Sequence, residues 1–207
     1  MTTSYDKEKW LKVCNTTLCN YINMEKRLSE NKKLSDFVLA YYSLFFIINS
    51  LTAVYFDLYN DKLCEYFGII LSVIMLAYSF INSNANYTRR IDIITNAINE
   101  LKTLKRTPFP DENIEIFVNK YNDIVDGVEF RNDIDFFRTI KSKCKEEGIK
   151  WYSKFNTNSS KEREQLKNYL SEISPFYLQM KIVLTFFSKI IVVILPPMVI
   201  MLCFIIK

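Results

Sequence analysis

The side chains that most often carry enzyme chemistry are missing or scattered in this sequence. It contains no histidine, which removes the commonest general base and the commonest zinc ligand. Its five cysteines show no C-x-x-C spacing; they are Cys14, Cys19, Cys64, Cys144 and Cys203. We therefore predict free thiols, and neither a disulfide framework nor a metal site.

The acidic residues show no catalytic arrangement either. Asp133 and Asp135 lie two positions apart on a predicted helix, so they point to different sides, and we interpret them as part of a solvated face. The sequence has no glycine-rich phosphate loop and no nucleophile elbow. We predict no catalytic residue, no cofactor and no metal ligand, and we expect the protein not to be an enzyme.

Long apolar runs take the place of such motifs. Residues 37–59 and 66–81 form two runs, separated by a short polar stretch that includes Asp61 and Lys62. About 20 apolar residues in a helix match the roughly 30 Å hydrocarbon core of a bilayer, so residues 37–81 predict a membrane hairpin. Buried core helices are the alternative, but a chain of 207 residues has little room to bury three such runs.

The third apolar run, residues 182–206, predicts a further span. Lys189 near its start either lies at the membrane boundary with its charge extended toward water, or serves as a pore or gating charge. Pro196 and Pro197 remove two amide donors. They are expected to kink or break the helix, which membranes tolerate where neighbours satisfy the freed carbonyls.

Composition and charge then give the fold class and the topology. Only three glycines and five prolines favour long helices, so we predict an all-α membrane protein. Seven basic residues precede the first span and only one lies in the hairpin turn, which places the N-terminus in the cytoplasm. The predicted domains are a cytoplasmic amphipathic arm of one or two helices at 1–36, a transmembrane hairpin at 37–81, a cytoplasmic helical region with a stalk helix continuing the second span at 82–180, and a C-terminal transmembrane helix at 181–207.

Small and polar side chains recur on one face of each hairpin helix. They are candidates for pore lining or helix packing: Ser43, Asn49, Ser50, Gly68, Ser72 and Ser79. One interpretation is close helix approach, because Gly68 and Ser72 form a small-x-x-x-small pair. The other is that several copies assemble and these faces line a polar path across the bilayer.

Beyond the hairpin, apolar residues step by four and three along a predicted helix. They form a candidate coupling seam: Tyr87, Ile91, Ile94, Ile98 and Leu101. The seam needs a partner, either the next helix of the chain or the same helix of another copy. Residues 83–180 carry sixteen basic and fifteen acidic side chains, and this near balance predicts no direct nucleic-acid binding.

Three stretches resemble the SLATT proteins, specifically the branch that accompanies bacterial reverse transcriptases: YINMEKRLSENKKLSDFVLAYYSLFF, NYTRRIDIITNAINELKTLKR and YNDIVDGVEFRNDIDFFRTIK. The resemblance implies a multi-pass effector in the bacterial inner membrane, acting in an antiviral or conflict system. It further implies a homo-oligomer that forms pores or disrupts the bilayer when a partner, such as a reverse transcriptase or other sensor encoded nearby, detects infection. Two rivals stay open: a non-conducting anchor or scaffold that recruits a partner enzyme, and a small transport or regulatory subunit.

Overall fold

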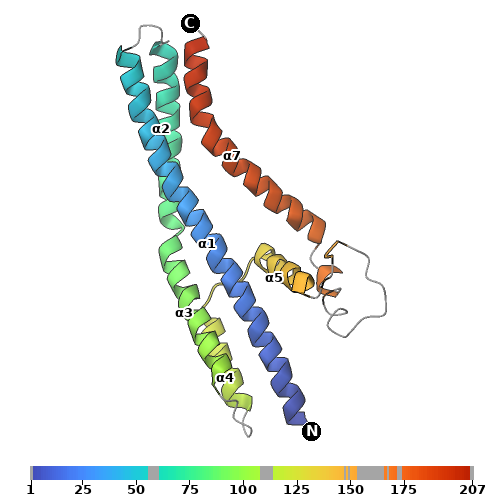
Figure 1. Ribbon diagram of the computed structural model, residues 1–207. Helices are drawn as coiled ribbons and strands as arrows, with labels where there is room; N and C mark the ends of the chain where they lie inside the picture. Colours follow the sequence, from blue (N-terminus) through green and yellow to red (C-terminus); the bar gives the residue numbers. More distant parts are fainter. Residues whose placement is uncertain are drawn as a thin grey trace. The chain divides into compact units, whose positions relative to one another are not determined.

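The computed structural model describes residues 2–55, 61–107, 114–146, 148, 150–152, 166, 168–171 and 174–205, and its regular structure in these ranges is entirely helical (Figure 1). The helices are α1 (Thr2–Tyr55), α2 (Asp61–Asn84), α3 (Tyr87–Arg106), α4 (Ile114–Asp126), α5 (Asp133–Glu146) and α7 (Pro175–Ile205). The all-α prediction is confirmed. Three stretches are long and apolar enough to cross a membrane: Glu8–Thr52, Glu65–Arg106 and Pro175–Val199.

Helix α1 is one uninterrupted helix of 54 residues. The chain has no glycine or proline before Gly68, so nothing in the backbone chemistry ends the helix between the polar arm and the first apolar run. The structure thus selects a single helix over two short ones for the arm and joins it to the first predicted span.

The expected continuation of the second span into a stalk is wrong, because α2 and α3 are separate helices. The amide of Ala85 still donates to Ile81 O at 3.1 Å, but Asn86 adopts a left-handed conformation with φ of 47°. Asparagine tolerates this region better than most residues do. Helix α3 therefore begins afresh at Tyr87.

The sequence predicts Asn132 or Asp133 as the cap of this helix, and in the structure Asn132 makes the capping contacts of α5. The amide of Ile134 donates to Asn132 Oδ1 at 3.5 Å, and the amide of Asn132 donates to Asp135 Oδ2 at 3.4 Å. This reciprocal pair satisfies donors that the first turn of a helix leaves open.

Several sequence predictions fall on residues outside the described ranges. The hairpin turn around Asn60 is one of them. The sequence also predicts a helix opened by Pro110 and Asp111 and another that Ser160 caps and that runs to Ile173; the opening of the first and most of the second lie outside the described ranges. In that last segment the structure describes helical conformation at Leu166 and at residues 168–171.

Two compact units divide the chain. The first unit comprises Met1–Ser29 and Thr88–Ile182, and the spanning unit comprises Glu30–Tyr87 and Val183–Lys207. Helices α1 and α7 contribute residues to both units.

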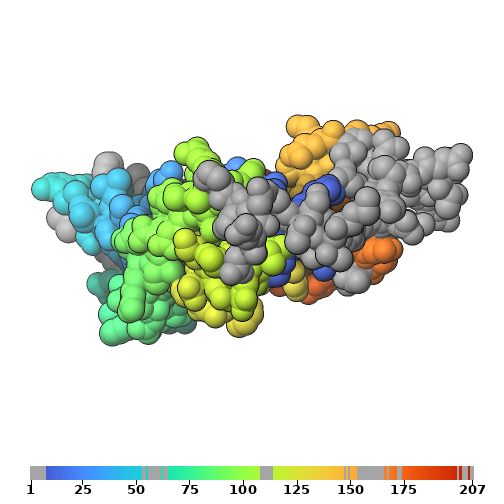
Figure 2. All heavy atoms as spheres, turned by 90° about the horizontal axis from the view of Figure 1, so that it is seen from below, coloured from blue at the N-terminus to red at the C-terminus, as the bar shows by residue number. Residues whose placement is uncertain are grey.

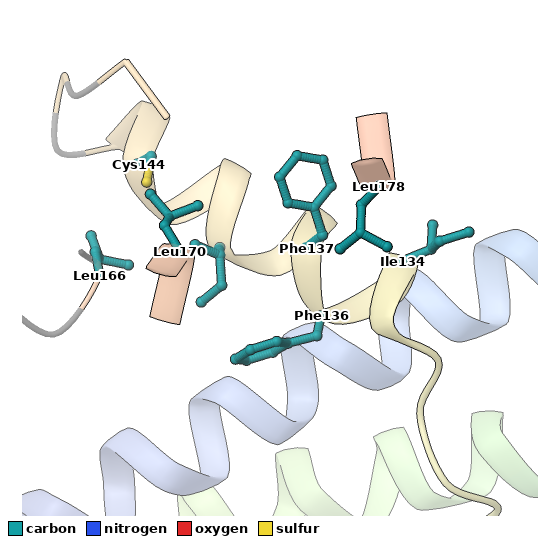
Figure 3. Close-up of a cluster of buried hydrophobic side chains, with 8 residues drawn as sticks. Ile134, Phe136, Phe137, Cys144, Leu166, Leu170 and Leu178 are labelled. Carbon is teal, nitrogen blue, oxygen red and sulfur yellow. The ribbon is translucent and has the colours of Figure 1, made fainter. Parts of the chain in front are cut away.

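An apolar cluster around α5 forms one core of the first unit. Figure 3 shows side chains of α5 facing Leu178 of α7 and Leu166 and Leu170 of the preceding segment. The cluster consists of Ile134, Phe136, Phe137, Ile140, Cys144, Leu166, Leu170 and Leu178. Phe137 is fully buried and meets Trp151 edge to face, with ring centroids 5.5 Å apart. This burial fixes α5 against the end of α7 that belongs to the first unit.

Helices α3 and α4 lie side by side in the same unit, as the green and yellow-green surfaces of Figure 2 show. Helix α1 packs near both. Thr95 Oγ1 donates to Glu25 Oε1 at 3.3 Å, and the Trp10 and Tyr121 rings lie 5.6 Å apart. Ile94, Ile98 and Leu101 of α3 are buried within the chain itself, so the apolar face of α3 has its partner there.

Candidate functional site in the membrane-spanning helices

The spanning unit is organised by an apolar cluster between α1, α2 and α7. Its buried members are Val38, Tyr42, Phe45, Leu71 and Val199, and the partly buried residues packed against them are Leu34, Tyr41, Phe46, Phe67, Met75 and Tyr78. The hairpin helices are also joined by a polar contact, because the Tyr78 hydroxyl donates to Ser35 Oγ at 2.9 Å. Ser35 is buried, so this bond satisfies a group that would be costly to leave unpaired in lipid.

Helix α7 passes through Pro196 and Pro197 without a break. In an α-helix the amides at these two positions would bond to the carbonyls of Val192 and Val193, four residues earlier. Proline has no amide hydrogen, so both carbonyls lose their partners.

Two adjacent tyrosines of α1 replace the missing donors. The Tyr42 hydroxyl donates to Val192 O at 2.9 Å, and the Tyr41 hydroxyl donates to Val193 O at 3.2 Å. Each proline therefore has one matching tyrosine, which confirms the expectation that neighbouring groups satisfy the freed carbonyls. The sequence contains both pairs, two tyrosines on the first span and two prolines on the third. Nothing in the sequence alone indicates that the one pair contacts the residues before the other.

The candidate residues of the first span divide between two environments. Ser43 and Ser50 are exposed, and the Ser43 hydroxyl donates to Leu39 O of its own helix at 2.8 Å. Asn49 is buried, with 8% of its surface exposed. Asn49 therefore faces the inside of the spanning unit, whereas the two serines face outward.

The candidate residues of α2 lie outside the apolar cluster of the spanning unit, in the part of the chain that the structure describes. Ser72 and Ser79 are exposed, and Ser72 Oγ bonds to Ile69 O of its own helix at 2.8 Å. A Cβ added at Gly68 would meet no heavy atom within 4 Å. The small-x-x-x-small pair thus makes no close helix approach inside one copy.

Large apolar side chains cover the rest of the outer surface of the spanning unit. Examples on the three helices are Leu51, Leu76 and Leu184, with 53%, 61% and 72% of their surfaces exposed. In water such a surface would be strongly unfavourable, and its natural environment is hydrocarbon. Together with the three membrane-capable helices, this pattern indicates a membrane protein.

The candidate seam on α3 is partly buried in the first unit. Ile94, Ile98 and Leu101 are buried, whereas Tyr87 and Ile91 are half-buried. The first two seam residues are therefore less buried than the last three. Its role in coupling stays a prediction.

A row of polar contacts between α1 and α5 was missed by sequence reasoning. Lys143 Nζ bonds to Thr16 Oγ1 at 2.7 Å, and Asn23 Nδ2 donates to Thr139 Oγ1 at 2.9 Å. The Arg27 guanidinium forms a bidentate pair with Asp135, at 2.9 to 3.1 Å. The α5 members of this row are four residues apart, so they share one helix face.

Asp135 corrects the interpretation of the acidic residues. Its side chain is fully buried and pairs with Arg27, whereas Asp133 is exposed. The two residues do point to different sides, but only Asp133 is solvated. A carboxylate is tolerated at a buried position when a hydrogen-bonded cation faces it, and a single sequence does not reveal an ion pair 108 residues apart.

The described cysteines are free thiols, as predicted: Cys14, Cys19 and Cys144. Burial raises the pKa of the Cys14 and Cys144 thiols, which keeps them protonated and unreactive. Within the described ranges, no group of three or more cysteine or acidic side chains is placed to hold a metal ion. Cys64 and Cys203 have side chains outside the description.

Comparison with known proteins places the chain in a family. No curated protein and no solved structure matches the chain. The sequence profile of one family, the SMODS and SLOG-associating 2TM effector domain family 5, matches residues 4–203. The match covers nearly the whole chain and includes all three apolar helices. The protein therefore belongs to the SMODS and SLOG-associating 2TM effector domain family 5.

Proposed function

We propose that the protein is a membrane effector of a prokaryotic conflict system that assembles from several copies and makes the bilayer permeable. The observation that carries the proposal is the outward position of the small and polar faces. Ser43 and Ser50 on α1, and Ser72 and Ser79 on α2, are exposed in the described part of one copy, and a Cβ added at the half-buried Gly68 would meet no heavy atom within 4 Å. Small side chains allow helices to approach closely, so contact with other copies, or with water in a channel, accounts for their outward position.

Several copies are required because two or three helices cannot enclose a water-filled path. In the proposed assembly, Gly68 allows close approach of a neighbouring helix, and the serine hydroxyls supply hydrogen-bonding groups along the path. Asn49 supports this arrangement from inside the spanning unit, since it is buried there.

Liposome leakage tests the proposal. The variant Ser72→Leu should reduce dye or ion leakage by at least tenfold while insertion into the membrane stays intact. Val73→Leu is the matched control, because Val73 is also exposed on α2 but is already apolar. Equal leakage for Ser72→Leu and the unsubstituted protein would contradict a conducting role for this face, and so would a complete absence of leakage at any protein density with the activating partner present.

The non-conducting anchor is the second candidate function. The large exposed apolar side chains of the spanning unit are sufficient to hold a chain in a bilayer, and they need no conduction. An anchor would bring a partner enzyme to the membrane through the first unit. Unchanged activity of Ser72→Leu would favour the anchor over the pore. A small transport or regulatory subunit is the remaining rival.

The resemblance to the reverse-transcriptase-associated branch suggests the partner and the place of action. We propose that the effector acts without catalysis and without binding nucleic acid itself, in the bacterial inner membrane, and that a neighbouring reverse transcriptase or other sensor triggers it. The basic-residue asymmetry supports a cytoplasmic N-terminus and an external hairpin turn. Labelling of a cysteine placed at Asn60 in intact cells tests this topology, and labelling only after the cells are opened would reverse it.

A further inference from the structure

The side of α5 that faces α1 carries polar side chains. Three of them follow one another at intervals of four residues, and each bonds to a side chain of α1: Asp135, Thr139 and Lys143. Their partners on α1 are Arg27, Asn23 and Thr16. We call these three contacts, all inside the first unit, the α1–α5 row.

Asn20 belongs to the same face of α1. It lies four residues after Thr16 and three before Asn23, so the three side chains share one side of the helix. Asn20 has 6% of its surface exposed, and its side-chain oxygen is buried without a hydrogen-bond donor from the described part of the chain. A buried oxygen without a donor is unfavourable, and water satisfies it when the two helices separate.

The opposite side of α5 is apolar and belongs to the cluster that Figure 3 shows. Its partners there come from α7 and from the chain between α5 and α7: Trp151, Leu166, Leu170, Leu178 and Ile182. None of the described members of this cluster lies on α1. Separation of these apolar contacts would expose their surface to water, so α5 is expected to stay with them.

Helix α1 also has an apolar side, and this side faces α3 and α4. Thr17 lies there, since its hydroxyl is 2.7 Å from the Tyr121 hydroxyl of α4. Met24 follows Thr17 by seven residues, Leu28 follows Met24 by four, and both are buried. Cys14, fourteen residues before Leu28, is fully buried on the same side.

The two sides of α1 therefore respond differently to water. Polar pairs exchange their partners for water at a small net cost, whereas separated apolar surfaces are strongly disfavoured in water. The ion pair between Arg27 and Asp135 also recovers the hydration that both groups lost on burial. Separation along the α1–α5 row is thus the least costly way to open the first unit.

We propose that the α1–α5 row is a latch: α5 separates from α1 together with its apolar cluster, while α1 stays packed on α3 and α4. The open form exposes Asn20 and Thr139 to water and leaves Cys14 and Cys144 buried. A partner that binds the open form more tightly shifts the chain toward it, so the latch gives the first unit a point of regulation. The proposal depends neither on conduction nor on membrane insertion.

Thiol labelling of the full-length protein in detergent tests the proposal, because the chain supplies its own controls. Thr139→Cys places a thiol in the row, and Cys144 is the matched control on the apolar side of the same helix, since both positions are 1% exposed. On α1, Asn20→Cys is compared with Cys14 in the same way. Mass spectrometry measures the rate of iodoacetamide labelling at each cysteine, and each rate is divided by the rate of the same cysteine in unfolded protein.

We expect the thiol at position 139 to react at least tenfold faster than Cys144, and the thiol at position 20 at least tenfold faster than Cys14. Equal rates within either pair of a folded variant would overturn the latch, because the row would then open only together with the apolar contacts. A variant in which the control cysteine reacts as fast as in unfolded protein does not fold, and the other pair then decides.

A further substitution tests whether the ion pair holds the latch closed. Arg27→Gln leaves Asp135 without its cation, so it should raise the labelling rate at position 139 by another tenfold or more and leave Cys144 unchanged. Arg90→Gln is the control, because it removes the partly exposed ion pair with Glu129 in the same unit, and it should change neither rate. Equal increases at position 139 and at Cys144 in Arg27→Gln would mean that the ion pair stabilises the whole unit, and they would overturn a separate latch.

Discussion

The first unit and the spanning unit both bury polar groups between helices, but they satisfy them with different partners. In the first unit side chains pair with side chains, and the central contact is the ion pair between Arg27 and Asp135. In the spanning unit the donors are neutral tyrosine hydroxyls: Tyr41 and Tyr42 donate to backbone carbonyls of α7, and Tyr78 donates to Ser35 Oγ.

The difference follows from the surrounding medium. Arg27 keeps 20% of its side chain exposed, so one end of the ion pair is partly hydrated and the cost of burying Asp135 is reduced. Hydrocarbon offers no water, so a neutral hydroxyl aimed at a carbonyl is the less costly contact there. The two units are therefore expected to respond differently when one partner is removed, and substitutions in each unit test this.

The largest effect is expected where a charge enters an apolar position of the first unit. Ile98→Asp places a carboxylate at a buried position of α3 and should destabilise the protein by about 3–5 kcal/mol or prevent folding. Asn99→Asp is the control, since Asn99 is exposed on the same helix. Denaturant unfolding in detergent measures both, and native stability of Ile98→Asp would show that the α3 face is accessible to water.

The ion pair should respond asymmetrically. Arg27→Met leaves Asp135 buried without its cation and should cost about 3–5 kcal/mol, whereas Asp135→Asn leaves a partly exposed arginine and should cost about 1–2 kcal/mol. Comparing the unfolding midpoints of the two variants decides the point. Equal losses of stability in the two variants would mean that the partial exposure of Arg27 does not lower the cost of leaving it unpaired.

The tyrosine contacts allow a sharper test because each has its own proline. Tyr42→Phe removes the donor to Val192 O and should cost about 1 kcal/mol. Pro196→Ala restores the amide that this carbonyl lacks, so in that background Tyr42→Phe should cost almost nothing.

Pro197→Ala is the matched control, because it restores an amide donor to Val193 O and not to Val192 O. The cost of Tyr42→Phe should persist in that background, and Tyr41→Phe should show the opposite pattern. Equilibrium unfolding in detergent measures the free energy of each variant, and double-mutant cycles then give the coupling energies. If Pro196→Ala and Pro197→Ala reduced the cost of Tyr42→Phe equally, the two hydrogen bonds would not be independent of each other.

The smallest effect is expected at Gly68. Gly68→Ala meets open space in one copy, so it should leave the monomer unchanged or stabilise α2 by up to about 1 kcal/mol. In the proposed assembly the added methyl separates neighbouring helices and weakens association. Unfolding measures the stability of the monomer, and cross-linking yield measures association between copies. Unchanged association would show that Gly68 does not lie in the contact between copies.

The predictable features are those encoded in local chemistry. Apolar runs and scarce glycine and proline gave the three long helices, and Asn132 gave the start of α5. Asn86 was missed because a single left-handed residue leaves little trace in an otherwise helical pattern.

The sequence could not predict which side chains far apart along the chain contact one another. Whether Asp135 is solvated depends on Arg27, and whether Asn49 and Ser50 share an environment depends on how α1 packs. One residue of helix rotates a side chain by about 100°, so these neighbours separate into buried and exposed positions. The exposure of Ser72 and the open space beside Gly68 likewise needed the structure.

The two prolines of α7 also have a consequence for biogenesis. Until it meets α1, α7 carries two carbonyls without donors, at Val192 and Val193, and each costs several kcal/mol in hydrocarbon. Synthesis from the N-terminus produces Tyr41 and Tyr42 long before Pro196 and Pro197. The hairpin is thus available as a template when the last helix emerges, and α7 expressed alone should integrate poorly into the bilayer. The order of the spans in the gene matches the order in which their backbone groups can be satisfied.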